Sequence, residues 1–174
     1  PETLLHVVAG CQTYLTQGIF TWRHDSILHF LAKSLQVVKG IALYADIPKF
    51  KSPSIITGES LRPDLLITSS DNCLYVLELS VSFESNLKNN LSRKKEKYKE
   101  LTKVLHSQFK KVTFVNLAIS ALGVFASESS ALLNMLAELG FDDKDQKYVI
   151  RNMMNIVIRT TYYMFCICWE LSSA

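Results

Sequence analysis

Two β-prone runs place the strongest constraint on how this chain folds. Asp64–Ser69 and Cys73–Val81 are rich in branched and apolar residues, and Ser70-Asp71-Asn72 separates them. Three polar residues of this kind are typical of a tight turn, so the two runs are predicted to pair as an antiparallel hairpin. A three-residue loop pairs Ser69 with Cys73, and this first pair fixes the register of every pair beyond it.

The predicted register places Asp64 opposite Glu78 on one face of the hairpin. Opposed side chains have Cβ atoms about 4.5 to 5.5 Å apart, so the two carboxylates are expected where a divalent metal ion could bridge them. Like charges held so close are otherwise destabilising. An ordinary acid pair on a half-exposed strand is the alternative. The other face carries the apolar pairs that should hold the register, Leu65 with Leu77 and Ile67 with Tyr75.

A long helix predicted from Glu84 to Ser107 carries one lysine in an unusual position. Lys94 falls on the apolar stripe of this helix, whereas Lys95 and Lys99 lie off it. A buried lysine requires a partner, so Lys94 is expected to reach the two acids. Alternatively, its stem lies on apolar surface while its amine extends to water. The stripe repeats at steps of three and four residues through Leu87, Leu91, Tyr98, Leu101 and Leu105.

The remaining patterns predict an α/β fold with a small mixed β-sheet flanked by helices. The chain is interpreted as one domain, with a helical segment at 1–38, a core at 39–124 and a helical extension at 125–174. The aromatic residues near the C-terminus are expected to close the core, and the alternative is contact with another domain or copy. These residues are Tyr162, Tyr163, Phe165 and Trp169. Helices are predicted at Glu2–Leu15, Phe20–Val38, Ser129–Leu139 and Asp145–Trp169, strands at Ile41–Tyr44 and Val112–Ser120, and a brief extended piece at Ser54–Thr57.

The positive charge of the chain is concentrated in one segment. The formal net charge is only +3, but from Lys88 to Lys111 there are nine Lys or Arg residues against two Glu, a net +7. Such a concentration is typical of phosphate contact, although a solvated helix face is an equally simple explanation. The four cysteines form no disulfide framework, which favours a reduced, intracellular compartment. The most apolar stretch, Thr160–Trp169, is too short to span a bilayer, so no membrane partner is expected.

The hairpin and the long helix together resemble a known nuclease pattern. Arg62-Pro63-Asp64, then Glu78, then Lys94-Lys95-Glu96-Lys97-Tyr98 is similar to PD-(D/E)XK nucleases, in the form found in the restriction-like endonuclease domain of site-specific non-LTR retrotransposon polyproteins. The standard pattern has its lysine two residues after the second acid, where this chain has Ser80. The resemblance implies that the lysine has moved to the following helix, and that the core is restriction-endonuclease-like.

The resemblance also implies the roles of individual residues. Asp64 and Glu78 would bind Mg²⁺ or Mn²⁺, and Lys94 would act with them in catalysis. Further residues would contact DNA, namely Arg62, Lys88, Arg93, Lys97 and Tyr98.

A second match lies in the N-terminal part. His6, Cys11 and Trp22-Arg23-His24-Asp25 are similar to the segment that joins the reverse transcriptase to this nuclease, in which a zinc knuckle precedes the nuclease. Only two of its four zinc ligands would be present, so no zinc is expected in this chain. Asp25 is a candidate further metal ligand, and Arg23 and His24 are other candidate site residues. Alternatively, His24 is a core histidine.

The implied function is a metal-dependent DNA endonuclease that nicks target DNA, so that the freed 3′ hydroxyl primes reverse transcription. Its implied partners are DNA and the reverse transcriptase and zinc-knuckle regions of the same polyprotein, and its implied setting is nuclear. The alternative is a catalytically silent DNA-binding or interaction module derived from such an element. Unrelated enzyme classes have little support, because the sequence has no Walker glycine loop, no Gly-x-Ser-x-Gly elbow and no HExxH helix.

Overall fold

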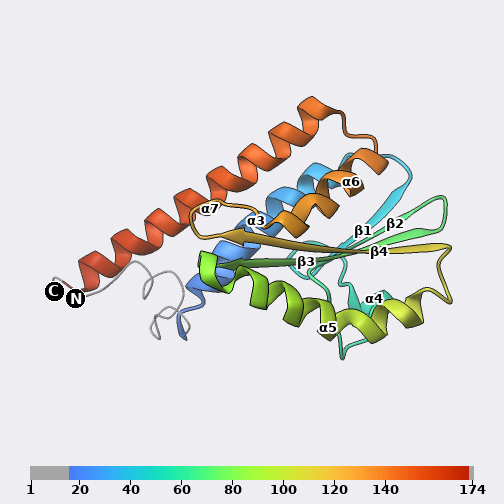
Figure 1. Ribbon diagram of the computed structural model, residues 1–174, viewed down its shortest axis with the longest axis horizontal. Coiled ribbons are helices and arrows are strands. Elements are labelled where there is room, and N and C mark those ends of the chain that lie inside the picture. The colour runs from blue at the N-terminus through green and yellow to red at the C-terminus, as the bar shows by residue number, and fades with distance from the viewer. Residues whose placement is uncertain (1–15, 173–174) are drawn as a thin grey trace.

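The computed structural model describes residues 16–172, with side chains described as far as residue 167. It arranges helices on both sides of one sheet (Figure 1). The predicted helix Glu2–Leu15 and the residues His6 and Cys11 lie outside the described part. In chain order, the elements are α3 (Ile19–Gln36), β1 (Ile41–Ala45), α4 (Ser54–Thr57), β2 (Leu65–Ser69), β3 (Cys73–Ser82), the 3-10 turn η1 (Glu84–Asn86), α5 (Leu87–Leu105), β4 (Lys111–Ser120), the 3-10 turn η2 (Ser127–Ser129), α6 (Ser130–Glu138) and α7 (Asp143–Ser172).

The four strands form a mixed sheet in the order β1-β2-β3-β4, which confirms the predicted α/β fold class. β1, β2 and β3 are antiparallel neighbours, and β4 runs parallel to β3. The predicted hairpin register is confirmed, because Leu65 pairs with Leu77. Asn72 closes the turn at φ 60°, a left-handed conformation that asparagine tolerates better than most residues, and its N–H donates to the Ser69 carbonyl over 3.1 Å.

Helices bury both faces of the sheet. α3, α6 and α7 cover one face, and α5 covers the other (Figure 1). The main apolar core combines residues of α3, all four strands, α6 and α7. On the α5 face, Leu66, Leu74 and Val76 pack with Leu105 in a second cluster. Polar side chains on this second face are therefore also removed from water.

The structure corrects two sequence predictions of local structure. Ser54–Thr57 forms a single helical turn, not an extended piece, because Pro53 holds a helical φ of −57° before it and Gly58 ends it at φ 75°. α7 is only partly a core helix. Val149 and Val157 are fully buried, but Tyr162 and Tyr163 are 69% and 54% exposed, so these two tyrosines do not close the core as expected.

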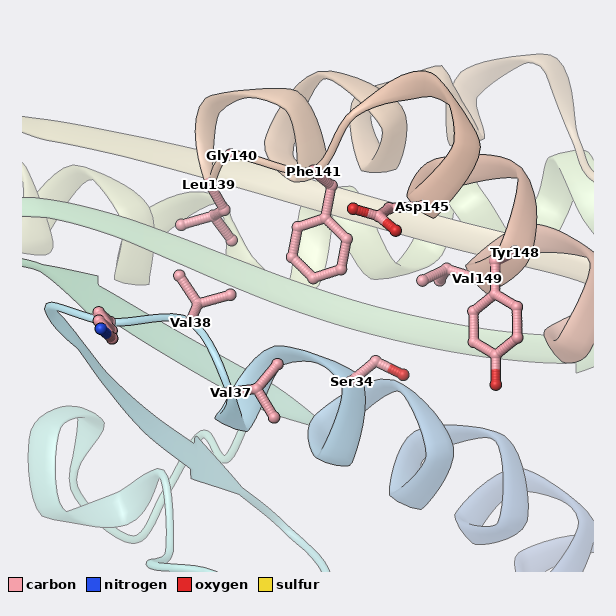
Figure 2. A pocket seen from close by; sticks show the side chains of 10 residues that line it. Ser34, Val37, Val38, Leu139, Gly140, Phe141, Asp145, Tyr148 and Val149 are labelled. Carbon is pink, nitrogen blue, oxygen red and sulfur yellow. The ribbon is translucent and has the colours of Figure 1, made fainter.

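A pocket of about 480 Å³ opens where α3 ends against the turn between α6 and α7 (Figure 2). Val37, Val38, Phe141 and Tyr148 give it a mainly apolar lining. This pocket lies at the C-terminal end of α3, whereas His24 lies near the start of that helix.

None of the helices in the described part of the chain combines the length and the hydropathy that a membrane span requires.

Candidate metal-binding and catalytic site

Asp64 lies immediately before β2, and its carboxylate is anchored to the neighbouring strand. The Leu79 N–H donates to Asp64 Oδ2 over 2.7 Å. Leu79 lies beyond the last β2–β3 pair, Leu65 with Leu77, so the Asp64 side chain continues the pairing where the β2 backbone has ended. The Asp64 carbonyl also accepts the Asp46 N–H over 3.0 Å, and this second contact holds the segment from its other side.

Glu78 is the most deeply buried carboxylate of the site, with 0% exposure in the middle of β3. Its side chain shares the α5 face with Val76. Lys94 donates to Glu78 Oε2 from α5, as the position of this lysine on the apolar stripe predicts. The second oxygen, Glu78 Oε1, is buried and has no hydrogen-bond partner among the described residues. A buried carboxylate oxygen without a partner is costly unless it serves a ligand.

The surroundings shift the pKa values of the two acids in opposite directions. Burial raises the pKa of Glu78, and the negative charge of Asp64 raises it further, against the opposing effect of Lys94. Burial also acts to raise the pKa of Asp64, but the hydrogen bond and charge of His24, with the charge of Lys94, outweigh it and lower the pKa below its ordinary value. Such divergent pKa values in adjacent acids are typical of functional sites.

His24, and not Asp25, is the α3 residue that meets Asp64. His24 Nε2 lies 3.3 Å from Asp64 Oδ2, and His24 Nδ1 lies 2.9 Å from Asp25 Oδ1. Burial lowers the pKa of His24, but the contacts with Asp64 and Asp25 dominate and raise it to about 9. The imidazole is therefore charged at neutral pH and donates to both acids. Asp25 lies on the other side of the His24 ring and orients it. Its predicted role as a metal ligand stays a prediction, because the described contacts of Asp25 include neither Asp64 nor Glu78.

Tyr98 lies inside the protein, at 1% exposure, beneath the segment that leads into Asp64. Its hydroxyl donates to the Arg62 carbonyl over 2.9 Å and accepts from Lys97 Nζ over 3.0 Å. Burial and the neighbouring Glu78 carboxylate raise the pKa of Tyr98 above its ordinary value. Because the ring is buried, Tyr98 does not present it at the surface for the DNA contact that the resemblance implied, and the residue supports the site from within.

Arg23 points away from the acids, toward α7. Its Nη1 lies 3.4 Å from Thr161 Oγ1, and its guanidinium lies 5.5 Å from the centre of the Phe20 ring. Burial lowers the pKa of Arg23 to about 10. This residue therefore joins two helices and is not brought to the acid pair.

The other predicted DNA-contact residues lie on the surface. Lys88, Arg93 and Lys97 are exposed along α5, and Arg62 is exposed with its Nη1 3.7 Å from Asp46 Oδ1. In the described part of the chain, Lys88 and Arg93 form no ion pair within 4.0 Å. Other lysines of α5 do form ion pairs, namely Lys99 with Glu96 and Lys103 with Glu100.

Asn116 is a site residue that the sequence analysis missed. It stands beside Glu78 in the parallel β3–β4 register, and its Nδ2 donates to the Leu91 carbonyl of α5 over 2.7 Å. Its Oδ1 is buried without a hydrogen-bond partner. The only available signal was a polar residue in the middle of an otherwise apolar strand. Asn116 fixes α5 to the sheet one turn before Lys94.

The donor chemistry of the acid pair suits a hard divalent cation such as Mg²⁺ or Mn²⁺. Carboxylate oxygens are the ligands these ions prefer, and Glu78 Oε1 supplies one that accepts no hydrogen bond from the described residues. No three His, Cys, Asp or Glu side chains in the described residues are gathered closely enough to hold a metal by themselves. Asp64 and Glu78 would therefore share the metal shell with other oxygen ligands, such as a backbone carbonyl, water or phosphate.

Solved structures of viral endonucleases share this fold. The chain is similar to the cap-snatching endonuclease of Toscana virus, with a TM-score of 0.51 at 16% identity over 85% of this chain and 66% of that one. A second Toscana virus structure gives 0.52 at 16% identity, over 90% and 68%. A cap-snatching endonuclease of the Phenuiviridae gives 0.51 at 15% identity, over 85% and 65%.

The chain thus spans a little under two thirds of the first two endonucleases' length. No protein-family model matches the chain, and no curated protein matches its sequence. At these identities the likeness concerns the fold, which agrees with the restriction-like endonuclease core that the resemblance to PD-(D/E)XK nucleases implied.

Proposed function

We propose that this chain is a divalent-metal-dependent endonuclease that cleaves phosphodiester bonds of nucleic acids at the site of Asp64, Glu78 and Lys94. The observation that carries the proposal is the fully buried Glu78 carboxylate, which is held by Lys94, lies close to Asp64 and keeps one oxygen unpartnered. Buried ion pairs of this kind contribute little net stability, because desolvation offsets their attraction. A functional reason for burying these charges is therefore favoured over a purely structural one.

The residues divide the chemistry between them. A bound Mg²⁺ or Mn²⁺ would lower the pKa of an attacking water and offset the charge that develops on the phosphate. Asp64 and Glu78 would hold this ion with their carboxylate oxygens. Lys94 offsets the charge of Glu78, and its ammonium group is placed to orient the nucleophile or to stabilise the charged transition state. The Leu79 N–H and His24 keep the Asp64 carboxylate oriented and ionised.

We propose DNA as the substrate and a retrotransposon as the setting. The support is the order and spacing of Arg62-Pro63-Asp64, Glu78 and Lys94 through Tyr98, together with the basic surface of α5. In this proposal the nuclease nicks target DNA in the nucleus to prime reverse transcription, beside the reverse transcriptase and zinc-knuckle regions of the same polyprotein. Exposed Lys88, Arg93 and Lys97 would hold the phosphate backbone, which positions the substrate without specifying its sequence.

RNA is the second candidate substrate. The likeness to viral cap-snatching endonucleases is the observation that favours it. Cleavage of labelled single-stranded RNA, compared with DNA of the same sequence under the same metal, separates the two substrates directly.

Nicking of supercoiled plasmid by the purified protein, with Mn²⁺ or Mg²⁺ and with an EDTA control, tests the proposal. We expect nicking that requires metal, and a loss of at least about 100-fold in Asp64→Asn and in Glu78→Gln, the scale on which a group that stabilises a transition state acts. Asp71→Asn is the matched control, because it neutralises an exposed acid in the turn of the same hairpin.

Two results would contradict the assignment. Equal nicking by the wild type and the two site variants would mean that Asp64 and Glu78 are not the metal ligands. Binding of nucleic acid with no cleavage of either plasmid or RNA would favour the silent binding module instead.

A further inference from the structure

A groove lies between the first turns of α3 and the C-terminal half of α7, and its lining does not include Asp64 or Glu78. We call it the α3–α7 groove. It has a volume of about 740 Å³, and its aromatic members are well exposed, with Trp22 at 43%, Tyr162 at 69% and Tyr163 at 54%. The two helices run side by side along this region (Figure 1). The groove is lined by Ile19, Trp22, Ile156, Arg159, Thr160, Tyr162, Tyr163 and Ile167.

The charge of α7 indicates what kind of partner fits this groove. Between residues 146 and 167 the helix carries Lys147, Arg151 and Arg159 and no acidic residue. All three cations are exposed, and Arg159 lies in the groove itself. The surface is therefore aromatic and positively charged, which complements a polyanion that also offers flat apolar faces.

The groove and the proposed catalytic site both use residues from the first turns of α3. Trp22 comes two residues before His24, which contacts Asp64 over 3.3 Å. Between them, Arg23 reaches across to Thr161 of α7, so the start of α3 is fastened to the helix that carries Arg159 and Tyr163. A nucleic acid held at the acid pair thus has this groove as a neighbouring surface.

We infer that the α3–α7 groove binds unpaired nucleotides of the nucleic acid, with bases stacking on Trp22 and Tyr163 and a backbone phosphate contacting Arg159. The two rings lie 5.5 Å apart at 58° and so do not stack flat against each other. Aromatic rings beside cations are the usual platform for single strands, because the faces of unpaired bases are free to stack. Bases within a duplex already stack on one another. The inference rests on the proposed nuclease function and adds the form of nucleic acid held beside the cut.

Fluorescence anisotropy in EDTA tests the groove without catalysis. The probe is a labelled oligothymidylate of about 12 nucleotides, within the site size of single-strand binding surfaces. We expect Tyr163→Ala to weaken binding at least about fivefold, the lower end of the effect of losing one stacked base. Arg159→Gln should reduce the slope of log affinity against log salt by about 0.7, the value for one phosphate contact on a single strand.

The chain offers matched controls for both variants. Tyr148→Ala removes a tyrosine of the same helix that is 61% exposed but lies outside the groove, and it should leave the affinity unchanged. Lys33→Gln removes an exposed cation at the far end of α3 and should leave the salt slope unchanged. Quenching of tryptophan fluorescence by the oligonucleotide, lost in Trp22→Phe, would report stacking at the groove itself.

Several outcomes would overturn the inference. Unchanged affinity in Tyr163→Ala would do so, as would binding of duplex DNA as tightly as the single strand. A third contradicting result is a change of oligomeric state in Tyr163→Ala, measured by sedimentation, without a change in affinity. The groove would then be an interface between copies of the chain. If groove variants bind weakly while neither plasmid nor RNA is ever cleaved, the nuclease proposal fails and the groove inference stands. If nicking occurs but groove variants bind normally, only the groove inference fails.

Discussion

The two sides of α5 carry the same pair of residue types in opposite surroundings. On the inner side, Lys94 pairs with the fully buried Glu78 across to β3. On the outer side, Lys99 pairs with Glu96 and Lys103 with Glu100, each three residues apart in the same helix and in open solvent. Water screens the outer pairs, so each contributes little to stability. The inner pair gives up its hydration for a single contact. Removing either partner would leave the other as a buried charge without compensation, which lowers the free energy of unfolding.

The largest effect is expected from breaking the inner pair. Lys94→Met leaves a buried carboxylate without its counter-charge and should lower the free energy of unfolding by about 3 kcal/mol in urea titrations. Lys99→Met, the same substitution on the outer side, should change the urea midpoint by no more than experimental error. Because Glu78 escapes part of the cost by binding a proton, the deficit of Lys94→Met should be smaller at pH 5 than at pH 8.

A double variant separates charge from packing. Combining Lys94→Met with Glu78→Met should recover most of the lost stability, since two apolar side chains replace the ion pair, while nicking stays abolished. Equal stability losses in Lys94→Met and Lys99→Met would show that the inner pair does not differ from the outer ones.

The second expected effect is a pH dependence that arises at His24. Contacts with Asp64 and Asp25 raise the pKa of His24 to about 9, above its ordinary value of 6.5. The folded protein therefore binds this proton more tightly than the unfolded chain does. The resulting stability, on the order of 2 kcal/mol, is complete below about pH 6.5 and is lost as the pH rises through about 9.

Urea titrations in EDTA between pH 6 and 10 measure this dependence. His24→Gln should flatten the curve over that range, whereas His29→Gln, on the same helix, should retain the slope of the wild type. A wild-type curve that is flat between pH 6.5 and 9 would contradict the raised pKa.

The hairpin shows how much of the site the sequence alone could predict. The three-residue turn Ser70-Asp71-Asn72 fixes the register, so the juxtaposition of Asp64 and Glu78 follows from a local rule. The approach of Lys94 follows as well, because helical periodicity alone places it on the buried side of α5.

The parts that could not be predicted depend on how distant elements pack. The rotation of α3 about its axis decides whether His24 or Asp25 reaches Asp64. Adjacent residues of a helix differ by about 100° in this rotation, so the sequence pattern did not separate them. Asn116 lies in the site because β4 pairs with β3 in parallel. No short turn connects these two strands, so their register could not be predicted from the sequence. Helical periodicity placed Tyr98 on the buried stripe of α5, but the partners of its hydroxyl, the Arg62 carbonyl and Lys97, depend on the packing of distant segments and could not be predicted.

Tyr98 supplies a third test, with a smaller expected effect. Tyr98→Phe keeps the ring and removes the hydroxyl, so the Arg62 carbonyl loses its donor and stability should fall by about 1 kcal/mol. Because this contact holds the segment that leads into Asp64, we expect kcat for nicking to fall more than KM rises. The control is Tyr44→Phe, in β1, where neither stability nor kcat should change. A pure rise in KM would instead indicate that the hydroxyl acts on substrate binding.

The smallest effect should come from comparing single cations on the outer side of α5. In the described residues, Arg93 has no acidic partner within ion-pair distance, whereas Lys103 Nζ lies 2.7 Å from Glu100 Oε1. If Arg93 contacts a DNA phosphate, Arg93→Gln should reduce the slope of log affinity against log salt by about 0.9. Lys103→Gln should change that slope less, because Glu100 already neutralises part of its charge. Equal slope changes would show that solvent screens the exposed ion pair so completely that it does not affect phosphate binding, and that only burial sets Lys94 apart.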